Sequence, residues 1–486
     1  MAVGTTRDGA IFVGGEFRPA SDGATHAVLE KATGEPLADV GVATLEDLDT
    51  AVSAAKRAQP AWAATTYDER AAILRAAASA LQARGDEIAD LIVRETGSIP
   101  GKAQYEVGGA ANELFEAAAL TSRAVGEILP SHSPTRVSIA ERVPMGVVGA
   151  ITPWNFPLIL GMRVVAPALA LGNTVVLKPS PETPLTGGLI IAELLAEAGL
   201  PAGALNVVTG DQEIGERLVA HPDTAMIHFT GSSAVGSRIA EVAGKQLKRV
   251  SLELGGNNAL VILEDADLDQ AAMIGAWSAW HYQGQTCITA GRHIVARPLF
   301  DAYVEALAAK AAAIAVGDPA REDVGLGPMI NERQRDRGHK FLTDSVAQGA
   351  RIVEGGTYDG LFYRPTVVTD IRTDMPLWTN EIFAPITPVL AVDSEEEAID
   401  LVNDTPYGLV NAVLTGDPDR GMQIASKLRS GMVHVNDSTC LDEAHVPFGG
   451  LGASGLGGRA GGESNLEEFT ERRWVSLQRA RSAYPY

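Results

Sequence analysis

The sequence has 486 residues, of which 46% are hydrophobic and 21% charged, and its 39 basic and 61 acidic side chains give a formal net charge of −22. This composition is typical of a globular protein with a large core, and the length predicts about three domains. The acidic balance argues against nucleic acid or an anionic membrane as the main partner, and two cysteines are too few for a disulfide framework. Met1 to Ala10 contains no apolar segment behind a basic start, so we expect no signal peptide and a cytoplasmic protein.

The first third of the chain predicts helices. Thr44 can cap a helix whose apolar stripe recurs every third or fourth residue from Leu48 to Ala55. Two further alanine-rich helices are predicted at 67–83 and 86–95. We therefore expect this third of the chain to be helical.

From residue 146 onward, short apolar strands alternate with helices. Strands are predicted at 146–152, 174–178, 205–208, 226–230 and 249–253, and helices at 158–171, 184–198, 213–220 and 233–242. Apolar runs of this length between helices indicate a parallel sheet covered on both faces, in which ligands bind beyond the carboxyl ends of the strands. The apolar stretch 146–177 is interrupted by prolines, asparagines and Arg163, which favours a buried α/β segment over a membrane span.

The same alternation resumes from Asn258 to about Val435 and predicts a second α/β domain. Two isolated strands, 136–142 and 473–478, are predicted outside both sheets. Because an exposed strand edge needs a partner, we expect these strands to pair with another subunit in a homodimer or homotetramer.

Reactive and polar residues follow the predicted strands in glycine- and proline-rich turns. Asn155 lies in TPWNFP, Lys178 in LKPSPETP, Ser232 in FTGSSAVG, Glu253 in SLELGGNN and Cys287 in GQTCITAGR. Each motif alone is a weak signal, since a lone cysteine is most often a small buried hydrophobe. Together they are far more specific.

These motifs, with NEIFAPI at 380–386 and PFGGLGASGLG at 447–457, occur in the order and spacing typical of the aldehyde dehydrogenase superfamily. The interval of 34 residues between Glu253 and Cys287 also matches the pattern of that family. The sequence resembles the superfamily from about Ile11 to Val475. The resemblance implies an α/β fold with a Rossmann-like parallel-sheet cofactor domain at 1–122 and 145–255. It further implies an α/β catalytic domain at 256–448 and a small β extension for oligomerisation at 123–144 and 467–486.

The resemblance also implies the catalytic roles. Cys287 would attack the aldehyde, because hydride cannot leave the carbon until a nucleophile has made it tetrahedral. The Asn155 amide and the Cys287 backbone N–H would stabilise the oxyanion, and Glu253 would activate water to hydrolyse the resulting thioester.

NAD is the cofactor that the resemblance implies, with NADP as an alternative. The residues assigned to it are Thr152, Pro153, Trp154, Lys178, Ser180, Gly215, Thr230, Gly231, Ser232, Leu254, Glu381 and Phe383. NAD-specific relatives often carry a glutamate three residues after the lysine, but Pro181 stands there in this chain and Glu182 follows it. We therefore expect NAD to be used and NADP to be tolerated. No metal site is expected, because the histidines show no paired ligand spacing with the cysteines.

The segments 154–173 and 287–293 look most like the bacterial benzaldehyde and vanillin dehydrogenase branch, which implies an aromatic aldehyde substrate. Leu160 and Ile288 would line an apolar slot, and Cys440 would border it. Arg163 supports an alternative, because similarly placed arginines grip the carboxylate in succinate-semialdehyde dehydrogenases. A CoA-acylating enzyme is a further alternative, although such enzymes typically lack the base that Glu253 would supply.

Overall fold

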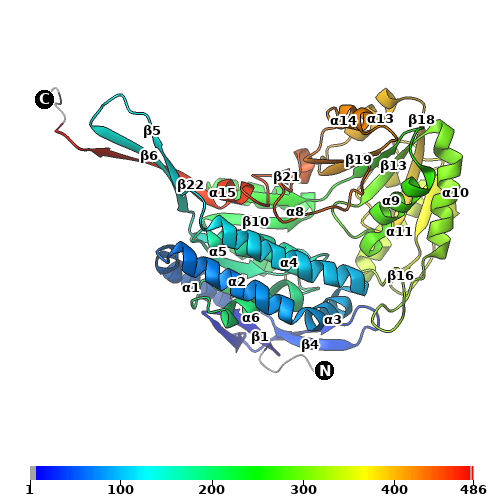
Figure 1. Ribbon diagram of the computed structural model, residues 1–486. Coiled ribbons are helices and arrows are strands. Elements are labelled where there is room, and N and C mark those ends of the chain that lie inside the picture. The colour runs from blue at the N-terminus through cyan, green and yellow to red at the C-terminus, as the bar shows by residue number, and fades with distance from the viewer. Residues whose placement is uncertain (1–6, 482–483, 485–486) are drawn as a thin grey trace.

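The structure is a computed structural model that describes residues 7–481 and 484. The expected outer boundaries at Met1 and Tyr486 therefore lie outside the described residues. Two α/β lobes lie side by side, and a narrow arm of strands projects from one of them (Figure 1). The α/β fold predicted from the sequence is confirmed.

The first lobe is built on an eight-stranded sheet of order β2-β1-β9-β8-β7-β10-β11-β21. Neighbours within the β9-β8-β7-β10-β11 run pair in parallel, whereas the outer pairings are antiparallel. All five strands predicted here are confirmed. The bounds are β1 (Ala10–Val13), β2 (Glu16–Pro19), β7 (Val147–Ile151), β8 (Thr174–Lys178), β9 (Leu205–Val207), β10 (Met226–Gly231), β11 (Arg249–Leu254) and β21 (Gly455–Leu456).

Helices pack against this sheet, and their sequences explain where they begin. Thr44 and Asp47 form a capping box at the start of the first helix, in which each side chain accepts the other residue's backbone N–H. The bounds are α1 (Leu45–Ala63), α2 (Tyr67–Ala83), α3 (Gly85–Thr96), α4 (Pro100–Leu120), α5 (Pro157–Ala170), α6 (Ile190–Glu197), α7 (Gln212–Ala220) and α8 (Ser233–Lys245). Every residue of α5 is buried, which suits a helix in which Arg163 is the one charged residue. In the part of the chain that the structure describes, no helix is long and apolar enough to cross a membrane.

Two expectations for this lobe are corrected. Strands precede the helices of the first third: β1 and β2 join the sheet, and β3 (Thr25–Leu29) pairs with β4 (Pro36–Gly41). These short strands are stabilised by pairing with other strands; for example, Phe12 lies opposite Val207. No local sequence pattern predicts them. The helix predicted at 184–198 begins as a π-helical turn, where the buried Glu95 carboxylate accepts the backbone N–H groups of Leu185 and Thr186.

The second lobe contains a seven-stranded sheet of order β14-β17-β18-β13-β12-β19-β20, parallel except for β14. The predicted alternation between Asn258 and Val435 is confirmed. Its strands are β12 (Asn258–Ile262), β13 (Ala290–Ala296), β14 (Arg351–Glu354), β17 (Thr366–Thr369), β18 (Ile386–Val392), β19 (Val410–Leu414) and β20 (Met432–Val435). Its helices are α9 (Leu268–Trp280), α10 (Arg297–Ala313), α11 (Glu332–Ala347), α12 (Pro376–Thr379), α13 (Glu395–Asn403) and α14 (Pro418–Ala425). The hairpin β15 (Tyr358–Asp359) and β16 (Phe362–Tyr363) lies outside this sheet.

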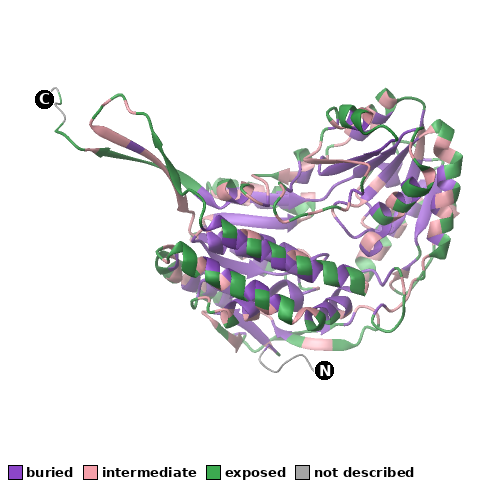
Figure 2. Cartoon of the chain, in the orientation of Figure 1, coloured by how far each residue is buried: buried purple, intermediate pink, exposed green. Residues whose placement is uncertain are grey.

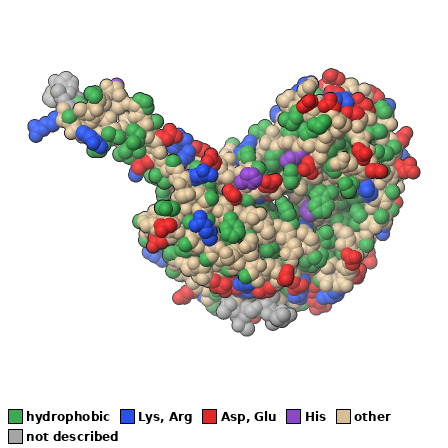
Figure 3. Space-filling model, in the orientation of Figure 1, with side chains coloured by type: hydrophobic (Ala, Val, Ile, Leu, Met, Phe, Trp, Pro, Cys, Tyr) green, Lys and Arg blue, Asp and Glu red, His purple; other side chains and the backbone are tan. Residues whose placement is uncertain are grey.

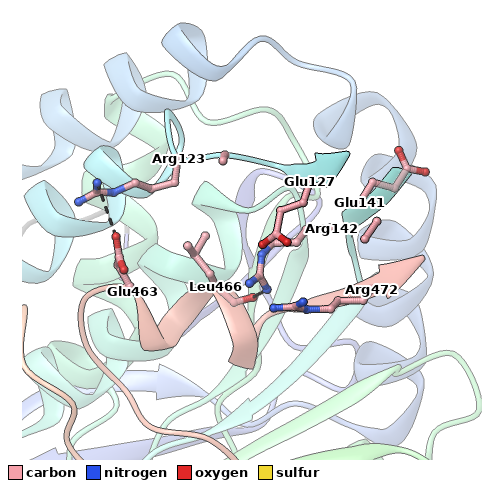
Figure 4. A pocket seen from close by; sticks show the side chains of 10 residues that line it. Arg123, Glu127, Glu141, Arg142, Glu463, Leu466 and Arg472 are labelled. Carbon is pink, nitrogen blue, oxygen red and sulfur yellow. Dashed lines mark hydrogen bonds and ion pairs between the residues drawn. The ribbon is translucent and has the colours of Figure 1, made fainter. Parts of the chain in front are cut away.

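The arm consists of β5 (Gly126–Leu129), β6 (Arg136–Pro144) and β22 (Thr470–Gln478). The predicted strands 136–142 and 473–478 do lie outside both large sheets, but they are not isolated, because β6 and β22 pair along their whole length. Most residues of β5 and β22 are exposed, whereas most of β6 is partly buried (Figure 2), and apolar side chains cover part of the surface of the arm (Figure 3). At its base, α15 (Ser464–Glu468) borders a hollow lined by arginines and glutamates, where Arg123 faces Glu463 (Figure 4).

Candidate active site

The carboxyl ends of four neighbouring strands bring the predicted residues of the first lobe to one edge of the sheet. Ile151 at the end of β7 lies beside Lys178 at the end of β8, and Thr230 of β10 lies beside Glu253 of β11. Asn155 follows β7 and begins the turn into α5. Parallel strands place their carboxyl ends together, so side chains far apart in the sequence become neighbours.

Cys287 comes from the second lobe, on the loop between η2 (His281–Gly284) and β13. Tyr282 and Gln283 adopt left-handed backbone conformations with φ of 50° and 56°, which is uncommon for residues other than glycine. The first lobe holds them there: the Tyr282 hydroxyl donates to the Thr96 carbonyl at 3.0 Å, and the Gln283 amide donates to the Gly97 carbonyl at 3.1 Å. Both hydrogen bonds fix the cysteine loop against α3.

The Cys287 backbone is fixed from the other side as well. The Asn258 side-chain amide, at the start of β12, donates to the carbonyls of Cys287 and Thr289, both at 2.8 Å. The loop that carries Cys287 is therefore hydrogen-bonded to both lobes. These bonds hold the thiol in a fixed orientation, as a reactive side chain requires.

A narrow pocket lies between the two lobes, beside Cys287. Asn155 and Cys287 both line it, and so do all four residues predicted to contact substrate, namely Leu160, Arg163, Ile288 and Cys440. The remaining lining residues were not predicted: Tyr105, Phe156, Ile159, His281, Thr286, Asp442 and Phe448. Phe156, Ile159, Thr286 and Phe448 lie within the quoted motifs and segments, and Asp442 lies two residues after Cys440, but nothing local marks Tyr105 or His281.

The polar groups near the thiol are buried. Burial raises the pKa of the Cys287 thiol well above its usual value, and the carboxylate of Glu381 adds to this effect. The Asn155 side-chain oxygen is buried with no hydrogen-bond partner among the described residues. Burial therefore favours the neutral thiol, whose proton must be removed before the sulfur can attack.

Glu253 lies at the end of β11 and does not line this pocket. Burial raises its pKa to about 8, against the opposing charges of Arg163 and Arg459. Its Oε2 atom has no hydrogen-bond partner in the described part of the chain. A carboxylate with a free oxygen and a pKa near neutrality can accept a proton from water.

A second group of polar side chains lies at the carboxyl ends of β7 and β8. The buried Lys178 ammonium donates to the Pro179 carbonyl at 3.3 Å, and burial lowers its pKa to about 8. The Thr152 hydroxyl is buried, and within residues 7–481 it has no partner. Gly215 lies beside the Lys178 stem, where a Cβ atom would make ordinary van der Waals contact with it.

Glu381 completes this side of the cleft. Its carboxylate accepts the Gly256 backbone N–H at 3.0 Å, and a Cβ atom at Gly255 would clash with it. Burial raises its pKa to about 7. Trp154 and Phe383 meet edge to face, with ring centroids 5.5 Å apart. The Thr152 hydroxyl, the Lys178 ammonium and the Glu381 carboxylate are groups that can hydrogen-bond to the hydroxyl groups of a sugar.

The other residues predicted to contact cofactor border the same sheet edge. Ser232 begins α8 without a side-chain capping bond, Leu254 ends β11, and Ser180 accepts the Glu182 backbone N–H at 3.2 Å. Pro153, Thr230 and Gly231 lie at or just after strand ends. Their contacts with a cofactor remain predictions.

Comparison with known proteins decides the family. The model of the aldehyde dehydrogenase family matches residues 17–475. The chain belongs to this family. The aldehyde dehydrogenase is 48% identical to vanillin dehydrogenase of Amycolatopsis over 98% of each chain, and 48% identical to benzaldehyde dehydrogenase [NAD(+)] of Pseudomonas putida over 94% of each. Its structure resembles betaine aldehyde dehydrogenase of Staphylococcus aureus in complex with NAD+, with a TM-score of 0.95, 31% identity and coverage of 98% and 96%. The resemblance inferred from the motifs is confirmed, and this aldehyde dehydrogenase is an oxidoreductase that acts on aldehydes.

Proposed function

We propose that this aldehyde dehydrogenase oxidises an aromatic aldehyde to the carboxylic acid, with NAD as the cofactor and a thioester on Cys287 as the intermediate. The observation that carries the proposal is the shared pocket, in which Cys287 and Asn155 lie among the apolar side chains of Phe156, Leu160 and Ile288. The relatives named for vanillin and benzaldehyde support the same substrate class.

The first step uses Cys287 and Asn155. The Cys287 thiol loses its proton to solvent water, its Sγ atom adds to the aldehyde carbon, and the carbonyl oxygen becomes an oxyanion. The Asn155 side-chain amide and the Cys287 backbone N–H donate to that oxygen, and a buried pocket strengthens both hydrogen bonds.

Bound NAD supplies the acceptor for the hydride that this tetrahedral carbon must lose. Lys178 and Glu381 would hold its ribose hydroxyls, and the N-terminus of α8 behind Ser232 would face its pyrophosphate. The free hydroxyl of Thr152 and the weakly bonded ammonium of Lys178 fit this role.

Glu253 then acts on the thioester. Its carboxylate takes a proton from water, the hydroxide adds to the carbonyl carbon, and the thiolate of Cys287 leaves as the acid forms. A CoA-acylating enzyme would have no use for this base. Oxidation in the absence of CoA therefore separates the two activities.

The cofactor proposal includes tolerance of NADP. Glu182 is engaged elsewhere: it accepts the Lys31 ammonium at 2.7 Å and the Asn331 amide at 2.8 Å. With Pro181 beside it, no carboxylate from this loop is free to repel a 2′-phosphate near Lys178.

The succinate-semialdehyde alternative requires a free cation, and Arg163 is not free. Its guanidinium donates to Glu113 at 2.9 Å and to Asp442 at 2.5 Å. Burial opposes the charge, but both carboxylates outweigh it and raise the pKa of Arg163. A substrate carboxylate would meet two like charges around one cation, which disfavours it.

We assign a separate role to each lobe and to the arm. We place the cofactor on the eight-stranded lobe and the nucleophile on the seven-stranded lobe. The exposed apolar side chains of the arm, including Ile128 and Trp474, would pack against another copy of the chain.

The test measures NADH formation by wild type and Cys287→Ala with benzaldehyde, vanillin, succinate semialdehyde and hexanal, without CoA. Best turnover with the aromatic aldehydes, absent in the variant, supports the proposal. Best turnover with succinate semialdehyde overturns the substrate class, and activity that survives in the variant overturns the thioester mechanism.

A further inference from the structure

The wall of the substrate pocket contains a carboxylate oxygen that the reaction does not use. Asp442 lines the pocket, and its Oδ1 atom is buried with no hydrogen-bond partner among the described residues. A buried unsatisfied acceptor is costly, and in a binding pocket it is suited to a donor on the ligand.

The rest of the Asp442 residue is held firmly. Its other oxygen, Oδ2, accepts the Arg163 guanidinium at 2.5 Å, and its backbone carbonyl accepts the Tyr105 hydroxyl at 3.0 Å. These contacts fix the carboxylate in one orientation and leave Oδ1 as its free acceptor.

Arg163 is itself fixed by three partners. It is paired with Glu113 of α4 and with Asp442, and its guanidinium lies over the Phe448 ring at 4.7 Å from the centroid. Glu113 therefore holds the Arg163 guanidinium, which in turn holds the Asp442 carboxylate.

We infer that Asp442 Oδ1 accepts a hydrogen bond from a hydroxyl group on the aromatic ring, so that the preferred substrates are phenolic aldehydes. This inference rests on the proposed function, because it assumes an aromatic aldehyde in the pocket. The apolar walls contact the ring faces, and the carboxylate is the acceptor for a donor on its edge. A charge-assisted hydrogen bond of this kind discriminates strongly against analogues that lack the donor.

The experiment compares kcat/KM for 3- and 4-hydroxybenzaldehyde with that for the matching methylbenzaldehydes, which have similar volume and no donor. The assay pH is kept below the pKa of each phenol, because a phenolate would be repelled. In wild type we expect a preference of about 10- to 100-fold for the hydroxyl compound in at least one pair. Because both kcat/KM values in a ratio are measured on the same enzyme, a difference between variants in the amount of folded protein does not affect the ratio.

Asp442→Asn and Asp442→Ala should reduce this ratio to within about 3-fold of one, since the charged acceptor is lost. Glu443→Gln removes an equal charge from the neighbouring, exposed residue and should leave the ratio unchanged. A ratio near one in wild type, or a ratio that survives in both Asp442 variants, overturns the inference.

Two further outcomes are distinguished. A ratio that collapses in His281→Phe but not in the Asp442 variants overturns our assignment. It assigns the hydroxyl to the Nδ1 atom of His281, which has no hydrogen-bond partner in the described part of the chain. Benzaldehyde itself tests the proposed function: its oxidation without any hydroxyl preference overturns only the inference, whereas no turnover of any aromatic aldehyde overturns both.

Discussion

Replacing Glu253 with glutamine isolates the second half of the proposed reaction. The side chain is buried, its Oε2 atom lacks a partner in the described chain, and the substitution keeps its size. Because the carboxylate is needed only to hydrolyse the thioester, formation of the thioester should continue in Glu253→Gln while its breakdown slows.

The size of the effect follows from the role and the burial. A general base contributes about 10²- to 10⁴-fold, so steady-state turnover should fall by that factor. In wild type, burial raises the pKa of Glu253 to about 8, so deacylation should rise with pH through that value. Glutamine cannot ionise, and the slow rate of the variant should not show this rise.

The same pKa shift has a consequence for stability. The folded protein binds a proton on Glu253 up to about pH 8, whereas the unfolded chain releases it near 4.5. The contribution of this group to stability is therefore complete below pH 4.5 and is lost as the pH rises toward 8, at a cost of about 3 kcal/mol at pH 7. Glu253→Gln removes this cost, so its melting temperature at pH 8 should equal or exceed that of wild type.

Rapid mixing with NAD and benzaldehyde provides the assay. We expect a burst of about one NADH per active site followed by slow turnover, and a benzoyl adduct on Cys287 in the quenched protein. Glu305→Gln, on the exposed face of α10, is the matched control and should behave as wild type. A variant that keeps full turnover, or that loses the burst together with the turnover, would refute the assignment of Glu253 to hydrolysis.

Three further predictions concern the cofactor and the scaffold. Lys178→Ala should raise KM for NAD by about 10- to 100-fold with a smaller change in kcat, measured by NAD titration, because it loses a buried donor to the ribose. NAD and NADP should give kcat/KM values within about 10-fold of each other, and Pro181→Glu should selectively depress the value for NADP by charge repulsion; a thousandfold preference of wild type for NAD would contradict this. Glu106→Ala should lower the free energy of unfolding by about 3–5 kcal/mol in urea titrations, because it leaves the fully buried Lys102 ammonium unpaired. The double variant Lys102→Met/Glu106→Leu should recover the part of that loss that comes from the unpaired ammonium, and no recovery would assign the loss to the backbone N–H groups of Leu158 and Ile159, which Glu106 also accepts.

Much of the eight-stranded lobe could be predicted from the sequence because its signals are local. The capping box at Thr44 acts within one helical turn, and the apolar runs at β7 and β8 show directly that these strands are covered on both faces. Parallel strands bring their carboxyl ends to one edge of a sheet, so the residues at strand ends could be grouped from the sequence pattern. For the same reason Asn155, Lys178 and Glu253 could be expected at one edge of the sheet, whereas their roles in a site came from the family resemblance.

The functional interpretation of the motifs did not rest on local patterns of this kind. Composition and periodicity say nothing of thioester chemistry, and the role of Cys287 came from the family resemblance. The structure adds what the motif does not contain, namely the anchoring of the cysteine loop through Tyr282 and Gln283 to the first lobe.

The tertiary structure alone decided the partners of Arg163 and the existence of the strands before α1. Glu113 lies 50 residues before Arg163 and Asp442 lies 279 residues after it, and no local pattern links them. Local periodicity reports which face of an element is buried, but it does not report which other element covers that face. The sequence shows that Arg163 carries a positive charge. It does not show that Glu113 and Asp442 pair with this charge, or that Asp442 keeps an oxygen without a partner among the described residues. Both features arise only when α4, α5 and the C-terminal loop pack together.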